Sequence, residues 1–516
     1  MAMKFHIQEY DEDPILFQGD QGTSEKTIPR REYQLDLSSS SVKINQVTTT
    51  THQSTWNALL RTPKQVLIDL FLPLGFPHSV DSSYLPYQFY DSLQGLCSYL
   101  RGVVSTSAVL AAAGVGNADA TAMGAAMTWA MKDGMGMIGG LVFSYYASPH
   151  FDAYVLEFRL FADLINDVAL TLDMLAPLVP SSCLLALMSA STLSKTMCGM
   201  SAGATKSSIT CHLALEGNMA DLNAKEGTQE TLVSLVGMIL GVQLAAMLKH
   251  LAEEYEEQPL TLYDTIPHEW QVPVEFAMSW TVFLFFTWLH MWANYRGVKL
   301  LKLNTLNRER ATVALEALVA AMAHSYDEDP NSDAAQLLMA QPQLLPGPND
   351  IEESMIRSTY TLLFPRRQSI VLGVSIMDIL KCMKSSKSVN DILQPSVDPE
   401  SLIQEFSEEK YIVGIVQKNK REYTVKSTLR NGAGNSDELK AFVHCMLLRK
   451  CLDRSPQTDD TLQMIKTTRS QLDGLFGSKT GSLLMKQLSD RGWDMEARLY
   501  LGFGRQRTSW ESSKSD

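Results

Sequence analysis

The sequence predicts a mainly α-helical protein, in which a helical membrane-type bundle is followed by a small α+β domain at the C-terminal end. Several long windows between Gly102 and Tyr295 carry no charged residue, whereas the flanking regions are polar. Beyond Asp350 the pattern changes to a β-hairpin followed by amphipathic helices. A length of 516 residues is sufficient for about two or three domains.

Residues 1–52 are acidic and then rich in Ser and Thr, which predicts a flexible arm. The helical domain is expected over 53–310. Near its start, Phe71–Gly95 is rich in aromatic residues and contains three prolines, the last of them Pro86. Prolines at this spacing predict extended or turn geometry rather than one continuous helix. The segment is either a packed loop or a stretch lying at a membrane interface, where aromatic residues are enriched.

Two apolar segments are good candidates for transmembrane helices. Thr231–Leu248 has no charge over 18 residues, a length just sufficient to cross a hydrocarbon layer as a helix. Phe276–Tyr295 is more hydrophobic and contains three tryptophans. Three further segments are ambiguous because they are rich in Ser, Gly or Pro; they are Gly102–Ala118, Gly134–Phe151 and Met174–Ser194.

The charges around the two candidates are asymmetric. Lys249–Glu275 holds seven acidic residues and one Lys, whereas Arg296–Arg310 holds five basic residues and one acidic residue. Because basic residues are enriched in cytoplasmic loops, the 296–310 end is expected on the cytoplasmic side. The two helices and the acidic loop then form a transmembrane hairpin.

The chain becomes soluble in character after Leu300. Residues 311–350 read as a helix and a Pro/Gly linker, and 351–516 as the α+β domain. Residues 410–428 predict a β-hairpin, and Arg498–Phe503 a last strand. Three helical patterns lie between them, at Asp437–Leu452, Leu462–Phe476 and Ser482–Asp490.

Composition excludes several classes of protein. A net charge of −13 argues against a general nucleic-acid binder, which needs a basic face. The seven cysteines include no C-x-x-C pair, so neither a metal site nor a disulfide framework is expected. The N-terminal residues show no signal or transit peptide. Membrane localisation, with lipid as a partner, is therefore expected to depend on the internal apolar segments.

Polar residues in the apolar region are the candidate functional positions. On a helix over 159–173, polar residues lie near one face and apolar residues on the other. In a soluble protein this pattern is a solvated amphipathic helix; in a membrane bundle it marks a water-filled path or a paired polar site. A second polar group surrounds segment 218–230. The complete set is Arg159, Asp163, Asn166, Asp167, Lys206, His212, Asn218, Asp221, Lys225, Glu226, Gln229 and Glu230.

Three G-x-x-x-G pairs favour close helix–helix packing, because two glycines four residues apart share one helical face. The pairs are Gly136/Gly140, Gly199/Gly203 and Gly237/Gly241. The run 134–139 also has the spacing of a dinucleotide fingerprint, but a helical pattern rather than a strand precedes it. No nucleophile elbow, histidine metal pair or kinase-type motif is present, so the sequence predicts a protein that is not an enzyme.

Several specific motifs carry a resemblance to a known family. They are FLPLGFPHSVDSSYLPYQFYDSLQ (71–94), GVGNADATA (114–122), RLFADLINDVA (159–169), GATKSSIT (203–210), NMADLNAKEGTQET (218–231) and LHMWANYRGVK (289–299). In these motifs the chain resembles the Root UVB Sensitive (RUS) family. RGWDMEA (491–497) is similar, more loosely, to the C-terminal domain of that family.

The resemblance implies a eukaryotic, membrane-associated protein without an assigned catalytic activity. It implies links to UV-B responses, development, auxin transport and vitamin B6 homeostasis, and association with another RUS-family protein or with itself. It supplies no catalytic or cofactor-binding residues, so no cofactor is expected. Two hypotheses follow: a membrane protein acting in transport or in a complex, or a soluble or peripheral helical enzyme or carrier of a small phosphorylated ligand.

Overall fold

The structure, a computed structural model, describes residues 4–9, 31–36, 43–47, 63–113, 122–257, 274–329, 333–351, 369–384, 399–419, 422–454, 461–477, 482–503 and 507–509. Its α-helices are α1 (Pro63–Phe71), α2 (Tyr84–Ala112), α3 (Ala122–Ala147), α4 (Val155–Met174), α5 (Ser181–Leu213), α6 (Met219–Glu257), α7 (Val274–Leu300), α8 (Arg308–Glu328), α9 (Ala334–Ala340), α11 (Ile376–Lys384), α12 (Pro399–Glu405), α13 (Asn435–Arg454), α14 (Thr461–Phe476) and α15 (Leu483–Asp490). The short 3₁₀ helices are η1 (Ser148–His150), η2 (Ala176–Leu178) and η4 (Pro342–Leu344). The strands are β1 (Lys4–Glu9), β2 (Arg31–Asp36), β3 (Lys43–Val47), β4 (Ile370–Leu372), β5 (Tyr411–Asn419) and β6 (Glu422–Leu429).

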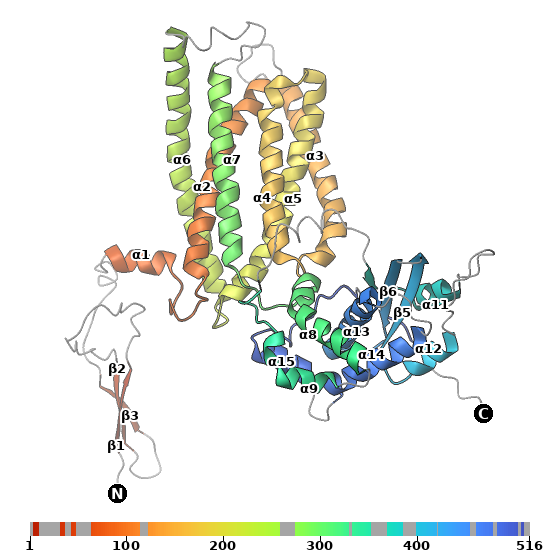
Figure 1. The fold of residues 1–516 in the computed structure, drawn as a ribbon. Coiled ribbons are helices and arrows are strands. Elements are labelled where there is room, and N and C mark those ends of the chain that lie inside the picture. The colour runs from red at the N-terminus through yellow and green to blue at the C-terminus, as the bar shows by residue number, and fades with distance from the viewer. Residues whose placement is uncertain are drawn as a thin grey trace. The chain divides into compact units, whose positions relative to one another are not determined.

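The predicted fold class is confirmed: long helices dominate, and the C-terminal part adds a small sheet (Figure 1). The N-terminal part differs from the expected arm, because β1, β2 and β3 form an antiparallel sheet. Phe5 pairs with Leu35, and Leu35 with Ile44. Lys4–Glu9 and Arg31–Asp36 alternate apolar and polar residues, which is the sequence signal of a strand.

The described residues belong to two compact units. The first unit comprises residues 1–120, 170–184 and 206–300, and the second comprises 121–169, 185–205 and 301–516. In the first unit, α2 packs against both α6 and α7, and α1 contacts α6. Val104, Leu170, Met174 and Phe283 form a small apolar core there.

Helix α2 corrects the prediction that Pro86 interrupts the helix. Pro86 occupies the first turn of α2, which begins at Tyr84. The backbone N–H groups of a first turn have no partner within the helix, so a proline costs little there. The side chain of Asp81 accepts hydrogen bonds from the backbone N–H and the hydroxyl of Ser83, which fixes the chain just before the helix. Pro177 and Pro180 separate two helices, because α4 ends at Met174 and α5 begins at Ser181.

In the second unit, the core around α3 and α4 is aromatic. Phe143 stacks on Phe161 with 5.9 Å between ring centroids, and Phe151 meets Phe158 edge to face at 4.7 Å. Ala147 is buried with Phe158 and Phe161. Offset and edge-to-face pairs are the arrangements that aromatic quadrupoles favour.

The C-terminal part of the second unit has its own hydrophobic core, built on β4, β6 and β5 in that order. The predicted hairpin is confirmed: β5 and β6 are antiparallel, and β4 adds to β6 in parallel. The predicted last strand at Arg498–Phe503 is wrong, because Tyr500 forms only an isolated bridge with Asn307. A run of apolar and aromatic residues pairs as a strand only where a sheet edge is available to it.

This core also includes residues of 311–350, where a helix and a linker were expected. Leu315 and Leu318 of α8 are fully buried in it, and Leu345 is almost fully buried. The Trp493 indole N–H donates to the Pro346 carbonyl at 2.9 Å. The Pro/Gly segment is therefore packed against the C-terminal domain, and its Pro346 carbonyl accepts a hydrogen bond from that domain.

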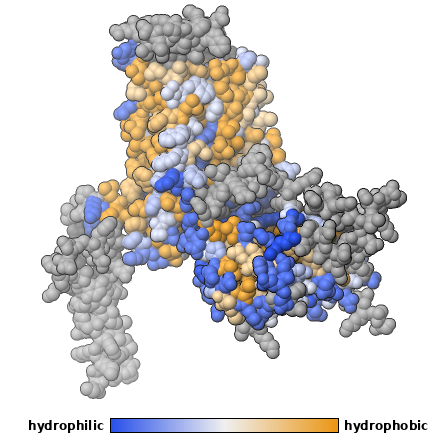
Figure 2. Space-filling view, in the orientation of Figure 1, coloured by the Kyte–Doolittle hydropathy of each residue, from blue (hydrophilic) through white to orange (hydrophobic). Residues whose placement is uncertain are grey.

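Within the described part of the chain, three helices are long and apolar enough to cross a membrane. They are Tyr84–Ala112, Met219–Leu251 and Phe276–Leu300. The last two were predicted as transmembrane candidates, whereas only the C-terminal part of the first, within Gly102–Ala118, was noted as an ambiguous apolar segment. Figure 2 shows hydrophobic residues gathered over the long helices and hydrophilic residues over the C-terminal elements.

Candidate functional site

The polar N-terminal half of α6 holds the segment that joins α1 to α2. The Asp221 carboxylate accepts a hydrogen bond from the Leu74 backbone N–H at 2.7 Å. The Lys225 ammonium donates to the carbonyl of Asp69, and the Gln229 amide donates to the carbonyl of Phe71 at 2.8 Å. These three polar side chains, one turn apart on α6, satisfy backbone groups at and after the C-terminal end of α1.

A second cluster in the same unit is centred on the buried carboxylate of Glu226. The Gln88 amide of α2 donates to Glu226 Oε1 at 3.0 Å, and Lys206 Nζ of α5 lies 3.8 Å from Glu226 Oε2. Lys206 also pairs with Glu230 at 2.6 Å. Because Glu226 is buried and Glu230 is exposed, the Lys206 ammonium bridges the interior and the surface of this end of the helices.

The chain between α5 and α6 pairs with the segment before α2. The Asp81 backbone N–H donates to the carbonyl of Leu213, and Val80 forms a β-bridge with Ala214. His212 lies in the last turn of α5, and Asn218 precedes α6 and accepts from the Leu222 N–H through its carbonyl. The structure thus brings the predicted positions from Lys206 to Glu230 to one end of the first unit.

A buried polar seam between α2 and α7 was missed by the sequence analysis. The Gln94 amide donates to His290 Nε2 at 3.1 Å, and Arg101 Nη1 lies 3.4 Å from Thr287 Oγ1. Arg101 and His290 are each 0% exposed, and Asn294 is also buried. The available signal was a polar or charged residue inside an otherwise apolar helix, which in a membrane segment marks a functional or paired position.

The polar stripe of α4 points inward. Asp163 and Asp167 are 4% and 7% exposed, whereas the neighbouring Leu164 and Val168 are each 43% exposed. The solvated amphipathic helix of a soluble protein has the opposite orientation. Arg159 and Asn166 are partly buried beside them. These four residues belong to the second unit, whereas the positions from Lys206 to Glu230 belong to the first.

The three glycine pairs differ in their surroundings. A Cβ atom at Gly237 would lie 2.9 Å from the Tyr99 ring, and one at Gly241 would lie 3.0 Å from Val103, both on α2. Cβ atoms at Gly136 and Gly140 would meet Thr192 and Thr196 of α5 at 2.7 and 2.6 Å. At Gly199 and Gly203 an added Cβ would meet no described atom within 4 Å, so α5 is open there.

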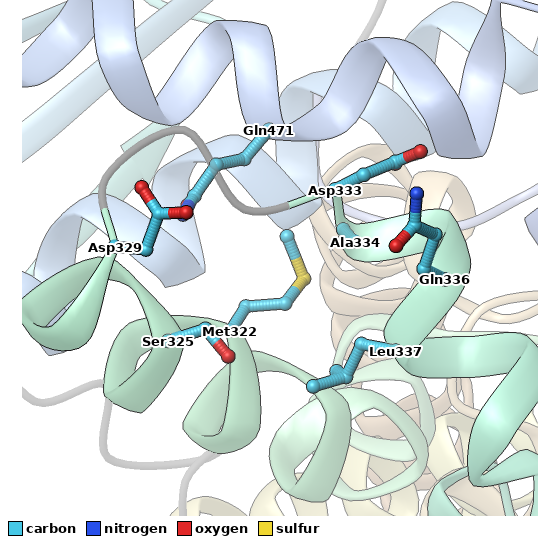
Figure 3. Close-up of a pocket in the computed structure, with 8 residues that line it drawn as sticks. All are labelled: Met322, Ser325, Asp329, Asp333, Ala334, Gln336, Leu337 and Gln471. Atoms are coloured by element: carbon cyan, nitrogen blue, oxygen red, sulfur yellow. The ribbon is translucent and has the colours of Figure 1, made fainter.

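A cavity of about 290 Å³ lies in the C-terminal part of the second unit, between α8, α9 and α14 (Figure 3). Its lining residues are Met322, Ser325, Asp329, Asp333, Ala334, Gln336, Leu337 and Gln471. Asp333 already accepts the Ala335 N–H at 2.9 Å as the cap of α9. Among the described residues, no group of three or more His, Cys, Asp or Glu side chains is placed to hold a metal ion.

The fold and these polar clusters define a helical-bundle protein with membrane-length apolar helices and a separate α+β core. Residues 57–321 match the family profile described as "Vitamin B6 photo-protection and homoeostasis domain", and residues 360–510 match "Root UVB sensitive protein, C-terminal". The chain belongs to the Root UVB Sensitive family. The expected family is thereby confirmed for both parts of the chain.

Curated relatives support this assignment. The chain is 31% identical to "Protein root UVB sensitive 3" of Arabidopsis thaliana over 390 residues, covering 75% of this chain and 76% of the relative. It is 33% identical to "RUS family member 1" of Dictyostelium discoideum over 327 residues, 63% of this chain and 53%, about half, of that relative. "Protein root UVB sensitive 2, chloroplastic" of Arabidopsis thaliana is 33% identical over 181 residues, 35% of this chain and 41% of the relative. No solved structure matches the chain significantly.

Proposed function

We propose that this protein is an integral membrane protein in which α2, α6 and α7 cross a bilayer. The observation that carries the proposal is the reversed distribution of side chains. Leu235, Ile239 and Val242 of α6 are exposed, whereas Glu226 is buried on the same helix. On α7, Phe285 and Trp288 are exposed and His290 is buried. Lipid, unlike water, favours apolar side chains on the outside and polar side chains paired within.

We further propose that the protein acts without catalytic chemistry of its own, in transport of a polar solute or as part of a membrane complex. Buried polar groups within membrane helices are costly and mark solute paths or paired sites. The Gln94–His290 and Arg101–Thr287 contacts form such a seam between two of the proposed spans. The proposed partners are lipid and a second RUS-family chain, either another member or a second copy. The link to vitamin B6 homoeostasis would follow from this membrane role.

The alternative is a soluble or peripheral enzyme or carrier of a small phosphorylated ligand. The cavity in the C-terminal part could hold a small molecule by its volume. However, Asp329 and Asp333 contribute carboxylates to its wall, and none of its lining residues is basic. Two carboxylates repel a phosphate group, so this cavity does not favour the alternative.

Alkaline carbonate extraction of cell membranes tests the membrane proposal. We expect the protein to remain in the pellet with a known polytopic protein, and to appear in the supernatant only after detergent is added. A peripheral protein is the control for release. Release of this chain by carbonate would refute the proposed spans.

The role of the inward stripe on α4 is tested by Asp163→Ala and Asp167→Ala in a complementation assay. We expect loss of function at an unchanged protein level, because both carboxylates are buried. Leu164→Ala, on the exposed side of the same helix, is the matched control and is expected to complement. Full complementation by both aspartate variants would rule out a functional role for the stripe.

A further inference from the structure

We propose that α1, together with Leu74, Leu85 and Phe89, forms an interfacial foot that lies in the headgroup–acyl boundary of a lipid bilayer. The proposal rests on the proposed function and specifies where lipid meets this end of the protein. Helix α1 is nine residues long, so it is too short to cross a bilayer. A short amphipathic helix can instead lie at the membrane surface.

The side chains of α1 are arranged as in an interfacial amphipathic helix. Val66, Leu67 and Leu70 share one face, because they are one or three to four residues apart. All three are exposed, and Leu67 reaches 56%. Gln65 and the partly buried Ile68 lie on the opposite face, and Asp69 lies at the edge between the two faces. A helix whose apolar face is unpacked in water would be destabilised, and burying that face in the acyl boundary removes the cost.

The foot is held firmly to α6. Lys225 and Gln229 of α6 bind the carbonyl groups of Asp69 and Phe71 at the end of α1. Asp221 then binds the N–H of Leu74 in the turn that follows. Gly75 has a φ of 76°, a left-handed conformation that favours glycine and redirects the chain toward α2. These contacts give the conspicuous polar residues of α6 a positioning role.

An aromatic cluster marks the level of the membrane surface at this end of the same unit. Tyr90 of α2 meets Trp292 of α7 edge to face at 5.8 Å, and Phe89 packs against Tyr90 at 5.4 Å. The Arg296 guanidinium lies 5.9 Å from the centre of the Tyr90 ring. Trp and Tyr beside a basic residue are characteristic of the bilayer–water interface.

The position of α1 fits this level. Phe89 is exposed within the first turns of α2, and Leu85 and Leu74 extend the exposed apolar surface back toward α1. Figure 1 shows α1 running across the direction of α2 and α6 rather than along it. Phe89 belongs to the foot and also contacts Tyr90 of the aromatic cluster, so a single lipid surface can cover both. A protein partner would have to match two separate elements at once.

The test uses the full chain reconstituted in lipid vesicles, with a polarity-sensitive fluorescent amino acid placed at one position at a time. Position Leu67 lies on the apolar face of α1, and Gln65 on its polar face. Position Leu284, exposed near the middle of α7, reports on the membrane span. Lipids brominated either near the headgroup or near the bilayer centre act as depth-dependent quenchers.

At Leu67 we expect a blue-shifted emission and stronger quenching by shallow than by deep bromines. At Gln65 we expect little quenching, and at Leu284 stronger quenching by deep bromines. Deep quenching at Leu284 with none at Leu67 would overturn the foot and leave the membrane span intact. Absence of quenching at Leu284 would instead reject the span itself.

A photo-crosslinking amino acid at Leu67 distinguishes lipid from protein as the occupant. Lipid adducts, detected by mass spectrometry, are the expected product. Adducts to a second copy of the chain, or to another protein in native membranes, in place of lipid would overturn the assignment.

Discussion

Replacement of Gly237 by alanine tests the close approach of α6 to α2. The added Cβ would lie 2.9 Å from the Cγ and Cδ1 atoms of Tyr99 and 3.1 Å from its Cβ. These atoms are close to the backbone, so the tyrosine cannot move aside by a simple rotation of its far end. Overpacking of this kind costs about 1–3 kcal/mol. The better helix propensity of alanine offsets up to about 1 kcal/mol of that cost.

Gly203 provides the matched control, because it is also helical and no described atom lies within 4 Å of an added Cβ. There the gain in helix propensity stands alone, at up to about 1 kcal/mol. We therefore expect Gly203→Ala to be about 1–3 kcal/mol more stable than Gly237→Ala. The assay is thermal unfolding of the purified chain in one detergent, with wild type as reference.

A second substitution separates packing from other causes. Tyr99→Ala removes the ring that the new methyl group meets, so the double variant Tyr99→Ala, Gly237→Ala should lose less stability than the sum of the single variants. If Gly237→Ala proves as stable as Gly203→Ala, the α2–α6 contact is wrong. Additive losses in the double variant would place the cost of Gly237→Ala elsewhere.

Two further predictions concern buried polar groups. Glu226→Ala leaves the Gln88 amide without this hydrogen-bond acceptor and should lower the free energy of unfolding by about 1–3 kcal/mol. Glu230→Ala, at an exposed ion pair, should change the free energy of unfolding by less than about 1 kcal/mol. Equal losses of the two variants in thermal unfolding would contradict this. In the C-terminal core, burial, reinforced by the positive charges of Lys440 and Arg469, lowers the pKa of His444 from 6.5 to about 3. As the pH falls below about 6.5, the unfolded chain binds a proton at this histidine and the folded chain does not. The free energy of opening α13 should therefore decrease by up to about 1.4 kcal/mol per pH unit between those two pKa values. Hydrogen exchange of the α13 amides measures this, and an identical pH dependence in His444→Gln would refute it.

Much of the fold could be predicted from the sequence because its signals are local. The apolar run of α6 and the aromatic run of α7 are recognisable by length and composition. The hairpin of β5 and β6 is recognisable by its β-branched residues. The N-terminal part of α2 was missed because Pro86 reads as a break unless its exact place in the first turn is known. That place depends on Asp81 and Ser83, whose turn geometry a composition pattern does not specify.

The hydrogen bonds between polar side chains could be predicted only in part, for a different reason. The 218–230 segment is conspicuous because it is polar over a whole stretch. In the structure its Asp221, Lys225 and Gln229 side chains form hydrogen bonds with the backbone between α1 and α2. Gln94 and His290 are single residues 196 positions apart, and they become a pair only when α2 packs against α7. No local periodicity reports such a pair. The burial of Asp163 and Asp167 likewise depends on which face of α4 packs against neighbouring helices.

The fully buried Arg101 has a consequence for how the chain is made. Arg101 contacts Thr287, which is 186 residues further along the chain and lies on a helix synthesised much later. If α2 crosses a bilayer as proposed, an arginine at the helix centre costs roughly 2.5–3.5 kcal/mol while that helix is alone in lipid. On that proposal, the contact that offsets this cost for α2 forms only after α7 has emerged from the ribosome. A truncated chain ending before α7 should be recognised as unassembled and degraded.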